Sequence, residues 1–71
     1  MATRSYLVVI ERGERNFSAY VPDLPGCVAT GATREQTVER MREAIALHIE
    51  GLRTDGEPIP EPVTSAELVA A

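Results

Sequence analysis

The feature that most constrains this chain is a proline-rich stretch, Tyr-Val-Pro-Asp-Leu-Pro-Gly-Cys, at residues 20–27. Pro22 and Pro25 each have a fixed φ and no backbone N–H, so neither fits inside a central strand. Asp23 can accept hydrogen bonds from nearby N–H groups, and Gly26 can adopt a positive φ. The stretch therefore predicts a stiff turn that ends one strand, starts the next and offers a preformed contact surface.

The chain has the size of a single domain, at 71 residues. A core this small supplies only a few kcal/mol, unless disulfides, a metal or a partner subunit help. One cysteine, Cys27, excludes an intrachain disulfide, and one histidine, His48, leaves too few ligands for a structural zinc site. We therefore expect no metal and no cofactor, and a partner subunit as the source of additional stability.

The net charge of −4 resides in the last part of the chain, because the arginines and acids of residues 1–53 cancel. The four uncompensated acids are Asp55, Glu57, Glu61 and Glu67. An acidic balance favours basic partners over phosphate backbones, although a modest charge also serves solubility. No apolar run approaches the roughly 20 residues of a membrane span, and no signal-peptide core precedes the first strand. We expect a cytoplasmic protein without membrane contact.

The residues before the turn predict two antiparallel strands. Residues 4–11 are rich in β-branched and aromatic side chains, and both faces of this segment are apolar. One face carries Tyr6, Val8 and Ile10, and the other carries Leu7 and Val9. Residues 16–21 alternate between an apolar face and a more solvent-exposed face that includes Tyr20. Residues 27–30, after the turn, predict a short third strand.

A helix is predicted for residues 33–54. Thr33 and Gln36 fit a capping box, in which each side chain bonds a backbone N–H at the start of the helix. Apolar residues then recur at spacings of three and four, which makes one helical stripe. The stripe consists of Val38, Met41, Ile45, Ile49 and Leu52.

The residues after the helix predict a return of the chain along the surface. Three alternating prolines in residues 57–62 favour an extended segment that cannot pair as a ladder. Residues 63–69 fit either a short strand or a helical turn, and we favour the strand, which a right-handed crossover would lay parallel to the first. The predicted fold of residues 1–71 is thus one α+β domain, βββα(β), with a three-stranded meander in residues 1–31 and a proline-rich return in residues 57–71.

One face of the predicted sheet has no cover in this chain. The helix covers the other face, whereas Leu7, Val9 and Tyr20 make the open one partly apolar. We expect a homodimer or higher homo-oligomer through this face or an open sheet edge, with Leu7 and Val9 in the interface.

No set of side chains in the sequence predicts catalysis. The helix carboxylates fit a solvated face, His48 borders the apolar stripe, and Cys27 next to a turn glycine is more often buried than reactive. The arginines alternate with glutamates, so no basic nucleic-acid patch is visible. We expect a protein that is not an enzyme.

The tip of the proline-rich turn is the predicted site of partner contact. Asp23 and Leu24 place a charged and an apolar side chain side by side on a rigid support, flanked by Tyr20, Pro22 and Pro25. An equally good interpretation is that Asp23 only satisfies backbone N–H groups of its own turn.

Four blocks of sequence resemble the HicB-like antitoxin family of toxin–antitoxin modules. They are Phe-Ser-Ala-Tyr-Val-Pro-Asp-Leu-Pro-Gly-Cys at 17–27, Gly-Ala-Thr-Arg-Glu at 31–35, Glu-Ala-Ile at 43–45 and Gly-Glu-Pro-Ile-Pro-Glu-Pro at 56–62. The resemblance implies a partial ribonuclease H-like βββαβ fold. It also implies that the chain binds and neutralises a HicA-like toxin, a small ribonuclease that cleaves mRNA.

Many members of this family carry a further, C-terminal domain that binds DNA. The sequence stops at Ala71 without such a domain, so we expect no direct DNA binding from this chain. The alternative to an antitoxin is a stand-alone oligomeric domain with a regulatory or structural role and no toxin partner.

Overall fold

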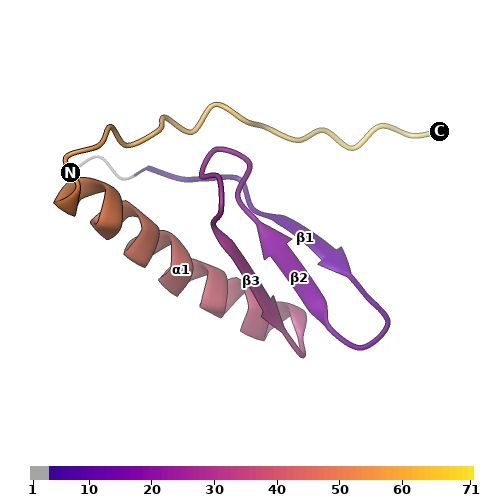
Figure 1. The fold of residues 1–71 in the computed structure, drawn as a ribbon. Helices are drawn as coiled ribbons and strands as arrows, with labels where there is room; N and C mark the ends of the chain where they lie inside the picture. Colours follow the sequence, from indigo (N-terminus) through magenta and orange to yellow (C-terminus); the bar gives the residue numbers. More distant parts are fainter. Residues whose placement is uncertain (1–3) are drawn as a thin grey trace.

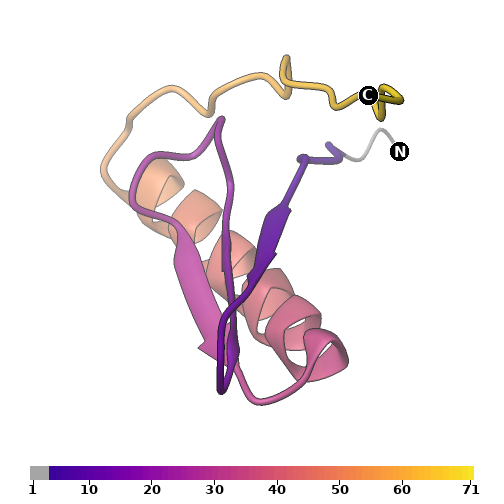
Figure 2. The ribbon, with the colours of Figure 1, turned by 90° about the vertical axis from the view of Figure 1, so that its right-hand side faces the viewer.

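Three short antiparallel strands and one helix form the fold of residues 4–71, the part of the chain that this computed structural model describes (Figure 1). The strands are β1 (Val9–Arg12), β2 (Phe17–Tyr20) and β3 (Val28–Gly31), and they are followed by α1 (Arg34–Thr54). The sheet order is β1-β2-β3, and both pairs are antiparallel. Figure 2 shows α1 against one face of the sheet. The predicted α+β arrangement of three strands and one helix is confirmed.

The strand register confirms the predicted alternation of faces. Ile10, Ala19 and Ala29 lie opposite one another across the three strands and pack in the core. The neighbouring row contains Val9, Tyr20 and Val28 and faces away from α1. β1 is shorter than predicted, because β2 ends at Tyr20 before the proline-rich turn and so provides no ladder partner for residues 4–8.

The N-terminus of α1 is capped by the predicted residues. Thr33 is the N-cap, and its Oγ1 accepts a hydrogen bond from the Gln36 N–H at 3.0 Å. The Gln36 side chain reaches one residue further back than a standard capping box, because its Oε1 accepts the Ala32 N–H at 2.7 Å. The backbone N–H groups of Gln36 in α1 and of Ala32 in the loop before it therefore both have hydrogen-bond acceptors.

The core lies between the sheet, the proline-rich turn and α1. Its buried apolar residues are Ala19, Val21, Leu24, Cys27 and Met41. α1 lies against β3 and β2 rather than under β1, so the rest of its apolar stripe is only half-buried. Within residues 4–71, no helix has the length and apolar character needed to cross a membrane.

The favoured fourth strand is wrong for the described chain. Residues 57–71 form neither a strand nor a helical turn but an extended tail that crosses the end of the sheet (Figures 1 and 2). The reason is that the tail is bonded to side chains near the proline-rich turn, which direct it away from the edge of β1.

Candidate partner-binding site

Residues 22–26, between β2 and β3, form the predicted stiff turn. The Val21 N–H donates to the Cys27 carbonyl at 3.2 Å, and the Cys27 N–H donates to the Leu24 carbonyl at 3.0 Å. Gly26 has a φ of 85°, a value that glycine adopts without steric cost. The backbone of the turn therefore satisfies much of its own hydrogen bonding and needs little ordering when a partner binds.

Leu24 lies under the turn and not at its tip. Its side chain is 0 % exposed and packs in the core with Val21, Cys27 and Met41. The expectation that Leu24 offers an apolar side chain to a partner does not fit this burial. Leu24 instead ties the turn to α1, so any contact through the turn depends on its neighbours.

Asp23 holds the tail, which neither sequence interpretation anticipated. One carboxylate oxygen accepts the N–H groups of Val63 at 3.1 Å and Thr64 at 3.0 Å, and the other accepts the Thr64 hydroxyl at 2.7 Å. The Thr64 N–H is the largest influence on the pKa of Asp23, and with the Thr64 hydroxyl and the Val63 N–H it lowers this pKa below its ordinary value. The carboxylate therefore stays ionised and bonded to the tail at neutral pH.

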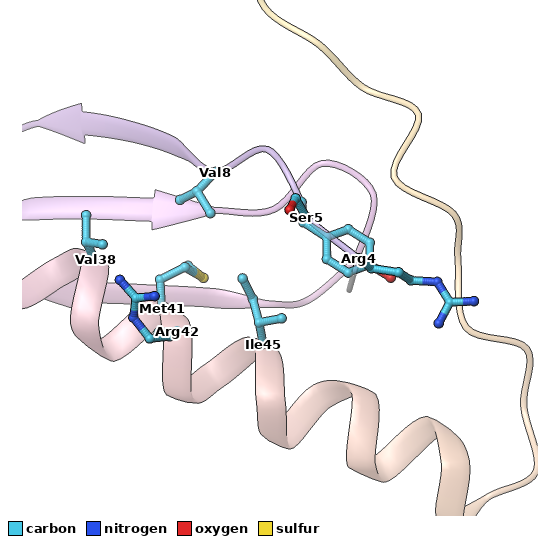
Figure 3. A pocket seen from close by; sticks show the side chains of 8 residues that line it. Arg4, Ser5, Val8, Val38, Met41, Arg42 and Ile45 are labelled. Atoms are coloured by element: carbon cyan, nitrogen blue, oxygen red, sulfur yellow. The ribbon is translucent and has the colours of Figure 1, made fainter. Parts of the chain in front are cut away.

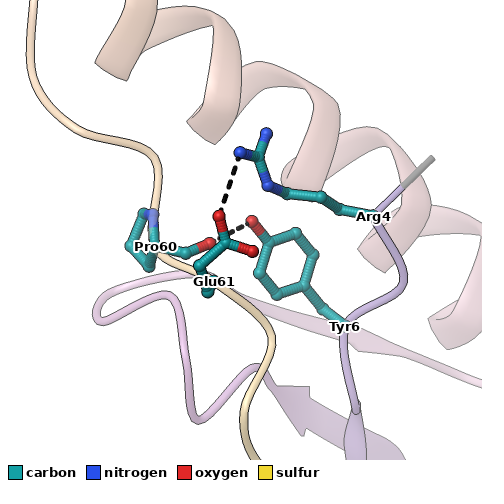
Figure 4. Close-up of polar contacts among 4 residues, drawn as sticks. All are labelled: Arg4, Tyr6, Pro60 and Glu61. Carbon is teal, nitrogen blue, oxygen red and sulfur yellow. Dashed lines mark hydrogen bonds and ion pairs between the residues drawn. The ribbon is translucent and has the colours of Figure 1, made fainter. Parts of the chain in front are cut away.

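A second anchor fixes the tail near its start (Figure 4). The Tyr6 hydroxyl donates to the Pro60 carbonyl at 2.6 Å, and Arg4 forms an ion pair with Glu61 at 3.4 Å. We call residues 57–64, which include both attachment points, the anchored tail, and residues 65–71 the free arm. Tyr6, Pro60 and Thr64 were not predicted as site residues, because no local pattern links positions that lie 41 to 54 residues from their partners.

The surface around these anchors combines the turn with the anchored tail. Of the predicted contact residues, Tyr20 and Pro25 are exposed, and Pro22 and Asp23 are partly exposed. Glu57 and Glu61 are exposed on the adjacent anchored tail. These acidic side chains thus lie on a segment whose backbone is held against the turn at Val63 and Thr64.

The described residues hold little that could perform chemistry. Cys27 is a buried free thiol, and burial raises its pKa, so it is a poor nucleophile. Within residues 4–71, no three histidine, cysteine or acidic residues lie close enough together to hold a metal ion.

Comparison with known proteins agrees with the resemblance seen in the sequence. Residues 6–71 match a family model described as "HicB_like antitoxin of bacterial toxin-antitoxin system". The chain belongs to this HicB-like antitoxin family. Because the family consists of antitoxins and not of enzymes, membership supports an antitoxin role without catalysis. No solved structure matches the chain, so the ribonuclease H-like outline stays a prediction.

Proteins similar to this chain occur in distant organisms. The chain is 38% identical over 56 residues to a UPF0150 protein of Thermoplasma acidophilum, covering 78% of this chain and 81% of the relative. It is 34% identical over 58 residues to a UPF0150 protein of Synechocystis sp., covering 80% and 73%. An uncharacterized 14.9 kDa protein of Haemophilus phage HP1 is 38% identical over 56 residues, covering 79% of this chain. The match spans only 42% of that phage protein, less than half its length.

The sheet face opposite α1 contains the residues predicted for self-association. Leu7 and Val9 are half-buried, and Tyr20 and Val28 beside them are exposed, with Val28 at 63%. Val9, Tyr20 and Val28 form one continuous row across all three strands. We call these three residues the outer row.

Proposed function

We propose that this chain binds a small HicA-like toxin ribonuclease and neutralises it by covering its RNA-binding surface. The observation that carries the proposal is the family match over residues 6–71. Inhibition by occlusion requires no catalytic group in the antitoxin, and it requires a surface that keeps its shape when the toxin binds.

Charge supports the choice of a toxin that binds RNA. An enzyme that binds RNA presents a basic surface to the phosphates. The acids that account for the net charge are all exposed and begin directly after α1, and one of them, Glu61, also pairs with Arg4. Such a surface attracts a basic partner over several ångströms, which increases the rate of encounter.

The proposed contact consists of the turn residues Tyr20, Pro22, Asp23 and Pro25 together with the anchored tail. Because Asp23 and Tyr6 already hold the tail in place, the tail loses little conformational entropy when the toxin binds. Asp23 is thus a positioning residue for the tail as well as part of the charged surface.

Co-expression tests the proposal directly. We expect a small basic protein encoded next to this chain to arrest growth alone and to be harmless when the chain is co-expressed. The two proteins should also co-purify, with weaker association at high salt. Equal toxicity with and without the chain, or no complex at low salt, would contradict the antitoxin proposal.

A second candidate function is a stand-alone homo-oligomer without a toxin. The outer row favours it, since an exposed apolar strip on an open sheet face is a typical interface between copies. A gene with no small basic neighbour, together with an oligomer that Val28→Glu disperses into folded monomers, would support this function over the first.

A further inference from the structure

A groove of about 490 Å³ opens between α1 and the segment that leads into β1 (Figure 3). Its apolar part is formed by Val8, Val38, Met41 and Ile45, and Arg4 and Arg42 also line it. A volume in this range is typical of sites that accept a ligand of drug size, roughly 300–1,000 Å³. The groove therefore has room for two or more side chains of a peptide segment.

The groove lies at an open edge of the sheet. β1 is one of the two edge strands in the order β1-β2-β3, and α1 packs mainly beneath the other two strands. The space beside β1 is where a fourth strand was expected from the sequence. Among the described residues, no segment pairs with that edge.

The tail of the same chain is directed away from this space. It contacts Tyr6 at Pro60 and reaches Asp23 at Thr64, so it leaves the groove before the free arm begins. A return to the groove would require a reversal within Ser65 and Ala66. Of these two residues, Ser65 is a type that turns favour, whereas Ala66 is not.

The free arm has the composition that the groove requires. All seven of its residues are exposed, with Leu68 at 99% and Val69 at 81%. In an extended segment, Glu67 and Val69 share one face and Leu68 points to the other. One face therefore combines an acid with an apolar side chain, which matches a groove of arginines and apolar residues.

We propose that the free arm of a second copy of this chain lies beside β1 and places Glu67 and Val69 in the groove, so that two copies exchange arms. Val69 then packs on Val38 and Ile45. Glu67 pairs with Arg42, whose side chain is 72% exposed and whose Nε also lies 3.5 Å from Glu39 Oε2 on the same helix. Leu68 extends the apolar outer face next to Leu7. This association involves no toxin, so its test is independent of the function proposed above.

A charge exchange tests the pairing without altering the core. At low salt, Arg42→Glu and Glu67→Arg should each weaken dimerisation several-fold, because each homodimer then has two like-charged contacts. An equimolar mixture of the two variants should form a heterodimer as strong as the unmodified homodimer. In that heterodimer, each groove meets an arm of opposite charge. A mixture that associates no better than the separate variants would overturn the proposal.

A second variant tests the apolar contact. Val69→Asp should raise the dimer dissociation constant at least about tenfold, since burying a valine is worth that factor or more. The matched control is Leu47→Asp, at a site on α1 that is 74% exposed and does not line the groove. Both variants should keep the helical circular dichroism spectrum, because neither site is buried.

Sedimentation equilibrium of the full chain distinguishes the outcomes. Loss of the dimer in Val69→Asp but not in Leu47→Asp supports arm exchange. A chain that is monomeric throughout the micromolar range overturns the proposal. So does a dimer that Val69→Asp leaves intact and Val28→Glu disperses, because that dimer uses the outer row.

Discussion

Two residues of the same turn, Asp23 and Leu24, have opposite roles. Asp23 bonds the tail at the surface, whereas Leu24 is sealed in the core. They were predicted together as contact residues because they are adjacent in a turn. Their side chains point to different surroundings, so substitutions at the two positions should have different consequences.

Asp23→Asn should release the anchored tail and leave the fold intact. Asparagine retains one acceptor oxygen, and its NH₂ group faces the N–H groups that the carboxylate formerly accepted. We expect faster hydrogen exchange at the Val63 and Thr64 amides, measured by NMR. Thr64→Val is the matched control, since it removes only the hydroxyl contact and should have a smaller effect.

The same anchor should open at low pH. The fold lowers the pKa of Asp23, so its contribution to stability is present above the ordinary aspartate pKa and is lost as the pH falls through the lowered value. The Val63 and Thr64 amide resonances should report this loss during an acid titration. If Asp23→Asn shows the same transition, another group is responsible.

Leu24→Ala should destabilise the whole domain. Removing a fully buried leucine side chain typically costs about 2–5 kcal/mol, which is a large part of the stability of so small a domain. Urea unfolding measures the loss. Pro25→Ala, at an exposed position of the same turn, is the control and should cost much less. Comparable losses in both variants would mean that Leu24 is not a core residue in solution.

Among the elements, the sheet and the helix approach each other closely at Gly31. A Cβ added there would lie 2.6 Å from Thr37 Oγ1 and 2.9 Å from the Thr37 backbone N. Thr37 cannot move aside easily, since it is fully buried and its hydroxyl donates to the Thr33 carbonyl at 2.7 Å. The end of β3 and the first turn of α1 therefore behave as one unit.

Gly31→Ala should push β3 and α1 apart. We expect it to lower the free energy of unfolding by about 1–3 kcal/mol, the usual range for overpacking. Gly51→Ala is the matched control, because no atom lies within 4 Å of its added Cβ and alanine favours helices by about 1 kcal/mol. The midpoint of urea unfolding should therefore fall for Gly31→Ala and rise for Gly51→Ala. If Gly31→Ala leaves the free energy of unfolding unchanged, the backbone around Thr37 relaxes to accept the added methyl group, and the prediction is wrong.

At the scale of the whole molecule, the anchors make the acidic tail part of the domain surface. A change there should affect toxin binding through long-range attraction. Glu57→Gln should slow association and reduce its salt dependence, with little change in dissociation. Glu43→Gln on α1 removes the same charge from another exposed position and is the control. Equal effects in stopped-flow binding would mean that only net charge matters.

The order and type of the three strands and the helix could be predicted from the amino-acid sequence. Alternation predicted which strand residues face the core, and the capping residues with the apolar stripe predicted the helix to within one residue at its start. The four matching blocks also indicated the family that the comparison confirmed. These features can be predicted from the sequence because each depends on residues that are close together along the chain.

The position of the tail and the exposure of the turn residues depend on contacts between segments that are distant in sequence. The bonds from Thr64 to Asp23 and from Tyr6 to Pro60 join positions 41 and 54 residues apart. The sequence of residues 63–69 fits either a short strand or a helical turn, and a strand also requires an edge to pair with. The two anchors carry this segment past the edge of β1, and so no fourth strand forms.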